Sequence, residues 1–359
     1  MIKSVHIQNF RGLTDLRLED CAQVNVLVGP NGVGKTTILE AIHLACSGND
    51  PSAFQRPAYF RGQLIQPISR GKDLPLRSLF RDLRTSNEIS IELDGPDTGH
   101  SLRISTVEPK QTVSLPSVDQ STDPGVLSDT HDIRALRFAY SHPTGPNAKK
   151  ANHEALMFLE DNGIKVRSGM CKNCTRSSFI ATRGVSALAD VAQLISNLSK
   201  QRQRSRLVTL MQAVDDRVRD FEVLTDEGVP VPHVDLAGSR TLLPVHVMGD
   251  GFMRLLQMAA YLLNPSIAVI AVDEIDSGIH YSVMTSIWGQ IVALLDQRPF
   301  QLFCTTHSEE MIEAAIPAFE SRESMLRVFR LDRHGTSLTV KARNLAQVRE
   351  LTQAGFELR

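Results

Sequence analysis

The feature that most constrains the fold is a glycine-rich segment between two contrasting patterns. Residues 29–36, Gly-Pro-Asn-Gly-Val-Gly-Lys-Thr, match the pattern G-x-x-x-x-G-K-[ST] in full. An apolar run over residues 24–28 precedes the segment, and apolar residues at helical spacing follow it over residues 36–46. A strand, a glycine loop and a helix in this order predict a phosphate-binding loop at the edge of a buried sheet.

The loop supplies most of the candidate nucleotide-binding residues. Glycines let successive backbone N–H groups point inward toward phosphate oxygens. Lys35 is expected to reach the β- and γ-phosphates of ATP, and the Thr36 hydroxyl to bind Mg²⁺. The candidates in this segment are Gly29, Pro30, Asn31, Gly32, Val33, Gly34, Lys35, Thr36 and Thr37.

A second motif pairs two carboxylates with a buried strand. The apolar residues 267–272 end at Asp273 and Glu274. Burying a carboxylate is costly unless a cation or hydrogen bonds compensate it. We therefore expect Asp273 to bind Mg²⁺ and Glu274 to polarise the attacking water. The alternative is that the two carboxylates only cap the end of the strand and have no catalytic role.

A third motif, Thr305-Thr306-His307-Ser308, follows the apolar residues 301–304. A histidine just past a buried strand can be an ordinary loop residue. Together with the first two motifs, however, the segment resembles the switch-histidine segment of ABC-type ATPases. This resemblance implies that His307 contacts the γ-phosphate of ATP and makes it a catalytic candidate beside Glu274 and Lys35.

These motifs also carry a family resemblance. Residues 7–13, Ile-Gln-Asn-Phe-Arg-Gly-Leu, resemble the opening of RecF, SMC and OLD-like ATPases. Residues 273–280, Asp-Glu-Ile-Asp-Ser-Gly-Ile-His, resemble the Walker B motif and D-loop of OLD-like AAA ATPases of bacterial defence operons. The resemblance implies that Arg11 approaches the nucleotide and that Asp276 lies near a dimer interface.

The same resemblance places a signature motif at residues 248–254. It implies that Gly249, Asp250 and Gly251 contact the γ-phosphate bound to the opposite subunit. The alternative is a plain helix start capped by Asp250. A Q-loop glutamine is also expected, with Gln55, Gln63 and Gln66 as candidates.

Composition limits the remaining possibilities. The 359 residues are 42% hydrophobic and 22% charged, and the net charge is −1. This balance indicates a globular cytoplasmic protein with no membrane partner, and any DNA contact must come from a local patch such as the basic run 200–206. We expect the five cysteines to be reduced and the pair Cys171 and Cys174 to be free of metal. The alternative is a metal site completed by His153 or by a second subunit.

The predicted fold class is α/β: an ABC-type P-loop ATPase head with a mixed sheet, a strand-rich N-terminal lobe and a helical insertion. The predicted divisions are residues 1–107 with the loop motif, residues 108–220 as insertion and helical region, and residues 221–359 with the remaining motifs. Residues 108–176 have no readable periodicity, because prolines interrupt the range and polar residues dominate it, and part of it is expected to be a mobile insertion.

The predicted function is ATP binding and slow hydrolysis in a homodimer or higher homo-oligomer that closes on ATP. The resemblance implies a separate effector, a nuclease or toxin, in anti-phage defence. A RecF-like DNA-binding repair ATPase is the main alternative. A transporter nucleotide-binding subunit and a non-hydrolysing ATP-sensing scaffold are two further alternatives.

Overall fold

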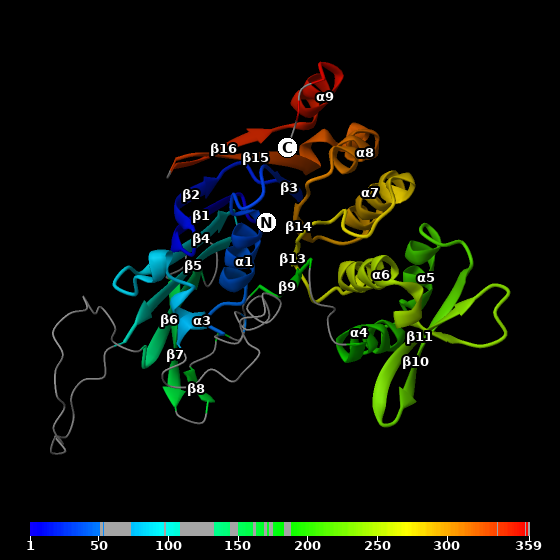
Figure 1. Cartoon of the computed structure of the whole chain (residues 1–359), viewed down its shortest axis with the longest axis horizontal. Helices are drawn as coiled ribbons and strands as arrows, with labels where there is room; N and C mark the ends of the chain where they lie inside the picture. The colour runs from blue at the N-terminus through cyan, green and yellow to red at the C-terminus, as the bar shows by residue number, and fades with distance from the viewer. Residues whose placement is uncertain are drawn as a thin grey trace, which may run out of the picture.

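A computed structural model describes the following residues of the chain: 1–50, 53, 73–96, 98–107, 133–143, 150–160, 163–168, 171, 175–182, 188–335, 337–355 and 357. The arrangement of its elements is shown in Figure 1. Three sheets organise these residues, and two large hydrophobic clusters lie on opposite faces of the six-stranded sheet that carries the predicted motifs.

The six-stranded sheet has the order β16-β15-β3-β14-β13-β9. All neighbouring strands from β15 to β9 are parallel, and β16 joins the edge antiparallel to β15. Its strands are β3 Val24–Val28, β9 Ser177–Ile180, β13 Val269–Val272, β14 Gln301–Thr305, β15 Leu326–His334 and β16 Ser337–Arg343. Strands β3, β13 and β14 are buried along their whole length and mostly apolar, because both faces of the sheet are covered.

A seven-stranded antiparallel sheet lies on one side of this core, in the order β2-β1-β4-β5-β6-β7-β8. Its strands are β1 Ser4–Phe10, β2 Leu13–Leu18, β4 Ile89–Gly95, β5 Thr98–Thr106, β6 Ala135–Pro143, β7 Lys150–Glu160 and β8 Gly163–Ser168. Two short helical turns, α3 Leu74–Arg77 and η2 Arg81–Leu83, precede β4.

Helix α1, Lys35–Cys46, packs between the two large sheets, and nearly all of its residues are buried. The opposite face of the six-stranded sheet is covered by α6 Asp250–Leu263, α7 Tyr281–Gln297 and α8 Glu309–Phe319. The C-terminal part adds η4 Glu320–Met325 and α9 Leu345–Gln353. The helix that follows the glycine loop is therefore held in a sandwich and has little freedom to move on its own.

A smaller helix-and-strand layer packs beside α6 (Figure 1). It comprises α4 Leu188–Lys200, α5 Arg204–Gln212, β10 Val218–Asp226, β11 Val229–Leu236, β12 Leu243–Pro244 and η3 Val245–Met248. No helix within the described ranges combines the length and apolar character that a membrane span needs.

The predicted α/β head with a mixed sheet is confirmed. The region without readable periodicity is partly regular, because residues 135–143, 150–160 and 163–168 form β6, β7 and β8, whereas residues 108–132 lie outside the described part. Leu136, Phe138 and Tyr140 alternate inward on β6, a pattern that the prolines and polar residues around it obscured. The predicted three-part division stays a prediction, although strands from all three ranges share the six-stranded sheet.

Candidate nucleotide-binding site

The predicted motifs meet at one edge of the six-stranded sheet. Strands β3, β14, β13 and β9 run parallel, so their carboxyl ends lie together. These ends carry the glycine loop, the residues 305–307, the pair Asp273 and Glu274, and Thr182. Motifs far apart in the sequence thus form a single polar site.

The glycine loop needs its glycines for close backbone approach. Gly29 has φ 140°, and a Cβ there would lie 2.3 Å from the carbonyl oxygen of Leu331. Gly32 and Gly34 also have positive φ, at 74° and 116°. Pro30, Asn31 and Gly32 are exposed, whereas Val33 and Thr37 are buried. The loop therefore offers an open backbone surface at the N-terminus of α1, where a phosphate is favoured.

Lys35 lies at the first position of α1 and is 6% exposed. Its ammonium donates hydrogen bonds to the carbonyl oxygens of Gly29 at 2.7 Å and Pro30 at 3.0 Å. Burial lowers the pKa of Lys35 to about 8, although Asp273 and Glu274 partly offset this effect. The lysine is charged at neutral pH and is folded back over the loop.

Asp273 is the most heavily hydrogen-bonded carboxylate of the site. The hydroxyls of Thr36 and Thr305 donate to Oδ1 at 2.9 Å and 2.8 Å, and the hydroxyl of Thr182 donates to Oδ2 at 2.9 Å. Thr36 and Asp273 together present the hydroxyl and carboxylate oxygens that Mg²⁺ prefers. The structure thus brings the two predicted metal ligands into direct contact.

Glu274 follows with a left-handed backbone, φ 47°, which is uncommon for a residue with a side chain. Three hydrogen bonds hold this conformation, and one of them runs from the N–H of Ser277 to the Glu274 carbonyl at 2.9 Å. The Thr305 hydroxyl accepts the Glu274 N–H at 2.7 Å, and the guanidinium of Arg254 donates to the Glu274 carbonyl at 2.9 Å. Arg254 also donates to the carbonyls of Asp273 and, at 2.7 Å, of Ala181. Helix α6 therefore clamps the backbone that carries both carboxylates.

The segment after β14 connects the site to the D-loop. The Thr306 hydroxyl donates to Asp276 Oδ1 at 2.5 Å and accepts the N–H of Ser308 at 3.0 Å. The pKa of His307 is lowered by burial and further by the nearby Lys35 ammonium, against the pull of the surrounding carboxylates. His307 is therefore mostly neutral at pH 7 and can share a hydrogen bond with a phosphate.

The predicted signature residues form the exposed start of α6. Gly249 has φ 90°, no side chain caps the helix, and Asp250 is exposed in the first turn. Gly251 lies against the D-loop, where its added Cβ would be 2.2 Å from the Gly278 carbonyl oxygen. The signature turn and the D-loop are thus one packed unit on the surface of the chain.

Arg11 has a different environment from the other predicted residues. It occupies the β1–β2 turn with φ 51°, and its Nε lies 3.0 Å from a carboxylate oxygen of Glu40 on α1. Both side chains are buried. Arg11 thus braces α1 from the side of the seven-stranded sheet, and its predicted approach to nucleotide stays a prediction.

Sequence reasoning missed two residues of the site and could not place a third group. Thr182 and Arg254 contact the Walker B segment. Thr182 belongs to no pattern that identifies it before the strand order is known, and Arg254 ends the predicted signature segment 248–254 but was given no role there. The Q-loop candidates Gln55, Gln63 and Gln66 lie outside the described residues. Among the described residues, the polar side chain that follows β9 and contacts Asp273 is that of Thr182.

Comparison with family models identifies the chain. A model described as an AAA domain matches residues 4–226, which is more than half of the chain. The chain belongs to this AAA-domain family. A second AAA-domain model, whose description names the AbiEii toxin and type IV toxin–antitoxin systems, matches residues 175–313.

Curated relatives agree with this assignment. The chain is 20% identical over 344 residues to an ATP/GTP phosphatase of Helicobacter pylori, and the alignment covers 87% of each protein. It is 30% identical over 154 residues to RecF of Idiomarina loihiensis, covering 39% of this chain and 42% of that protein. It is 27% identical over 160 residues to the OLD nuclease of Thermus scotoductus, covering 45% of this chain and 26% of that protein.

The fold agrees as well. An SMC head crystallised with the C-terminal winged-helix domain of ScpA aligns with a TM-score of 0.50 at 12% identity, over 97% of this chain and 99% of that one. The protein is therefore a P-loop ATPase of the ABC, RecF and SMC type, with an SMC-head-like fold, and it hydrolyses ATP.

Proposed function

We propose that two copies of this ATPase close around Mg²⁺-bound ATP, and that the resulting change of shape controls a separate effector, a nuclease or toxin, in anti-phage defence. The observation that carries the dimer is the exposed unit formed by the signature turn and the D-loop, since Gly251 packs against Gly278 with no room for a side chain. Because this turn faces outward, a phosphate that it contacts must be bound to another molecule.

Exposed apolar side chains support an interface on this unit. Val247, two residues before the turn, is 58% exposed, and Tyr281, just after the D-loop, is 69% exposed. Both residues adjoin Gly249 or Gly278 in sequence, where a partner subunit would cover them. The uncapped N–H groups at the start of α6 and the helix dipole favour an anion there.

Within each site we assign the following roles. Lys35 and the loop N–H groups hold the β- and γ-phosphates, while Thr36 and Asp273 hold Mg²⁺. Glu274 accepts a proton from the attacking water, and His307 contacts the γ-phosphate. Bound Mg²⁺ supplies charge neutralisation of the phosphates. Asp276, fixed by Thr306, lies at the proposed interface.

Mixed subunits test the composite site. Lys35→Ala removes phosphate binding from one subunit, and Asp250→Trp adds bulk to the exposed turn of the other without touching its own loop. Each variant alone should be nearly inactive, whereas mixing them should restore part of the ATPase activity, because each mixed pair keeps one intact site. Ala346→Trp, an equally exposed first-turn position of α9, serves as control and should keep full activity.

Two outcomes contradict the dimer. Mixed pairs that form by native mass spectrometry but recover no activity would mean that one chain completes its own site. Full activity of Asp250→Trp alone would remove the turn from the site altogether.

The effector proposal is supported by the toxin–antitoxin description of the second family model and by the partial match to an OLD nuclease. It is tested in the native host with the neighbouring genes intact. Cells carrying Lys35→Ala should lose protection against at least one phage that wild-type cells resist. Equal plaque counts over a broad phage panel would contradict a defence role.

A RecF-like DNA-binding function is the second candidate, favoured by the RecF match and by an exposed basic turn between α4 and α5. Lys200, Arg202 and Arg206 are exposed there. Fluorescence anisotropy with duplex DNA would support this candidate if the chain alone binds with steep salt dependence and if charge reversal at Lys200 and Arg202 removes it. Salt-independent or absent binding would leave the effector proposal in place.

A further inference from the structure

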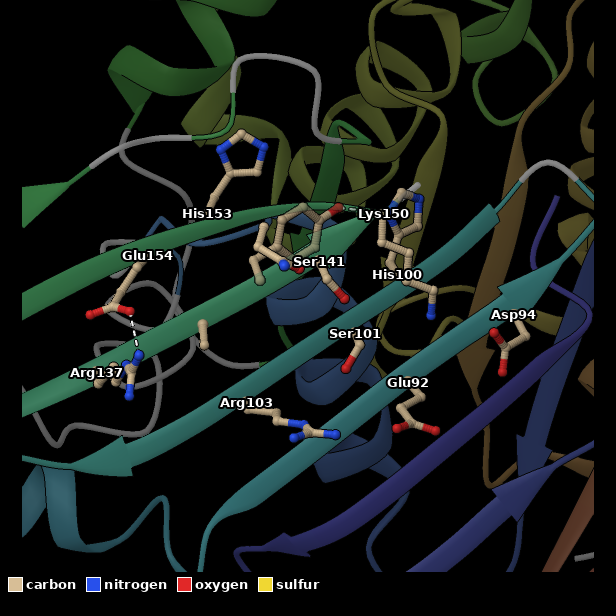
Figure 2. Close-up of a pocket in the computed structure, with 13 residues that line it drawn as sticks. Glu92, Asp94, His100, Ser101, Arg103, Arg137, Ser141, Lys150, His153 and Glu154 are labelled. Atoms are coloured by element: carbon tan, nitrogen blue, oxygen red, sulfur yellow. Dashed lines mark hydrogen bonds and ion pairs between the residues drawn. The ribbon is translucent and has the colours of Figure 1, made fainter. Parts of the chain in front are cut away.

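A cluster of three potential metal ligands lies away from the nucleotide site, at the far end of the seven-stranded sheet. A hydrogen-bonding nitrogen of His142, one of His153 and the sulfur of Cys171 all lie within 4.8 Å of one another. His142 is on β6, His153 is on the neighbouring β7, and Cys171 follows β8. His153 borders a hollow of about 640 Å³ on this sheet (Figure 2). We propose that His142, His153 and Cys171 bind Zn²⁺.

The distance between the two histidines fits one tetrahedral ion. Their Nε2 atoms are 3.2 Å apart. Zinc–nitrogen bonds of about 2.0–2.1 Å at a tetrahedral angle place two ligand nitrogens about 3.3 Å apart, and a zinc–sulfur bond of about 2.3 Å places sulfur about 3.6 Å from each nitrogen. The sulfur of Cys171 needs only a small side-chain movement to complete this geometry.

The hydrogen bond of the second ring nitrogen of His142 points the same way. Its Nδ1 lies 3.0 Å from the carbonyl oxygen of Pro143, and a carbonyl can only accept. Nδ1 therefore carries the hydrogen, and in the neutral ring Nε2 presents its lone pair toward His153. A backbone carbonyl on the second ring nitrogen is the usual support of a metal-binding histidine.

The neighbouring His100 is not a ligand by the same reasoning. Its Nδ1 lies 2.7 Å from the Tyr140 hydroxyl, and its Nε2 lies 3.3 Å from the Thr175 hydroxyl. Both ring nitrogens already have partners within the protein. His100 instead packs beside His142 and helps to fix the position of its ring.

Cys171 is also held in place independently of a metal. Its N–H donates to Oδ1 of Asn49 at 2.9 Å, and Asn49, just past the end of α1, is 1% exposed. A zinc ion would therefore join β6 and β7 to the segment between β8 and β9, which Asn49 holds near the end of α1. Nitrogen and thiolate ligands favour zinc over magnesium or calcium. This geometry reverses the preference drawn from the sequence, in which an isolated C-x-x-C pair indicated metal-free cysteines.

The competing interpretation is a plain N–H···N hydrogen bond between two neutral imidazoles. The two interpretations separate by metal analysis of the full-length protein, stripped with a chelator and then titrated with Co²⁺ or Zn²⁺ in the absence of nucleotide. The proposal expects one metal ion per chain. Bound Co²⁺ should show the visible bands of tetrahedral cobalt together with a thiolate-to-cobalt charge-transfer band.

Variants assign the ligands. His142→Ala, His153→Ala and Cys171→Ser should each weaken zinc binding by at least about 100-fold, the upper end of what loss of a mere supporting contact costs. Cys171→Ser should also abolish the charge-transfer band. His334→Ala, an exposed histidine at the end of β15, is the matched control and should bind metal as the wild type does. ATP binding by each variant reports whether the chain is folded.

Two results would overturn the proposal. One is a folded wild-type chain that takes up neither ion at stoichiometric concentration. The other is metal binding that survives in folded His142→Ala and Cys171→Ser, which would place the ion elsewhere.

Discussion

The contact between Gly251 and Gly278 makes a sharp prediction about a single methyl group. An alanine Cβ at position 251 would lie 2.2 Å from the Gly278 carbonyl oxygen, whereas real contacts of this kind are at least 3.0 Å. The start of α6 and the D-loop must therefore move apart in Gly251→Ala. Alanine normally gains about 0.5–1 kcal/mol over glycine in a helix, but overpacking costs about 1–3 kcal/mol. We expect a net loss of stability on the order of 1–2 kcal/mol.

The same displacement should affect catalysis. Gly278 follows Asp276 in the D-loop, and α6 carries Arg254, which holds the backbone of Glu274. A shift of this size at a catalytic group can cost about 10- to 100-fold in rate. Gly251→Ala should therefore lower kcat by about that factor while leaving ATP affinity unchanged, because the loop residues 29–36 are not displaced.

Gly289→Ala provides the matched control. Gly289 is also helical, in α7, but nothing lies within 4 Å of its added Cβ. This variant should gain about 0.5–1 kcal/mol and keep its ATPase rate. Thermal melting, steady-state ATPase kinetics and calorimetry of ATP binding measure the pair. If both variants melt and turn over alike, the proposed coupling of the signature turn to the D-loop is refuted.

Three further predictions concern the nucleotide site. Lys35→Ala should lose most ATP affinity in calorimetry. The pKa of Lys35 is lowered to about 8 and bound phosphates favour its charged form, so the ATP affinity of the wild type should fall above pH 8. Calorimetry in buffers of different ionisation enthalpy should then detect proton uptake on ATP binding. Glu274→Gln should keep ATP binding but lose about 100-fold or more in hydrolysis, and a wild-type rate would exclude Glu274 as the base. Arg254→Met should remove a hydrogen-bond donor from the carbonyls of Ala181 and Asp273, at about 1–3 kcal/mol each, whereas the Glu274 carbonyl keeps the N–H of Ser277. The variant should lower both the melting temperature and kcat, with Arg254→Lys in between, and wild-type values of both quantities would remove Arg254 from the site.

The sequence predicted the parts of the site that depend on local pattern. The loop around Lys35, the carboxylates after β13 and the segment around His307 each follow an apolar strand, and parallel strands bring such positions to one edge. Thr182 could not be found in this way. Its hydroxyl matters only because β9 lies beside β13, and strand order is set by long-range packing that a single sequence does not show.

Two parts of the fold were missed for a related reason. Strand β6 carries Leu136, Phe138 and Tyr140 on the face that packs inward, but polar residues and prolines on both sides of β6 obscured this short alternation. The hairpin of β15 and β16 was left unassigned, yet Leu331 on β15 supplies the carbonyl that packs against Gly29. The need for glycine at position 29 is thus explained by Leu331 on β15, a strand near the other end of the sequence.

The left-handed backbone of Glu274 gives the site a physical means of coupling to a second subunit. Such a conformation costs on the order of 1–3 kcal/mol for a residue with a side chain, so it persists only where other contacts hold it. One contact, from Thr305, comes from the neighbouring strand and is fixed by the sheet. A second, from the N–H of Ser277, lies within the D-loop, and a third, from Arg254, comes from α6, whose first turn is exposed. A partner that presses on the first turn of α6 therefore acts through Arg254 on the backbone of the proposed catalytic carboxylate.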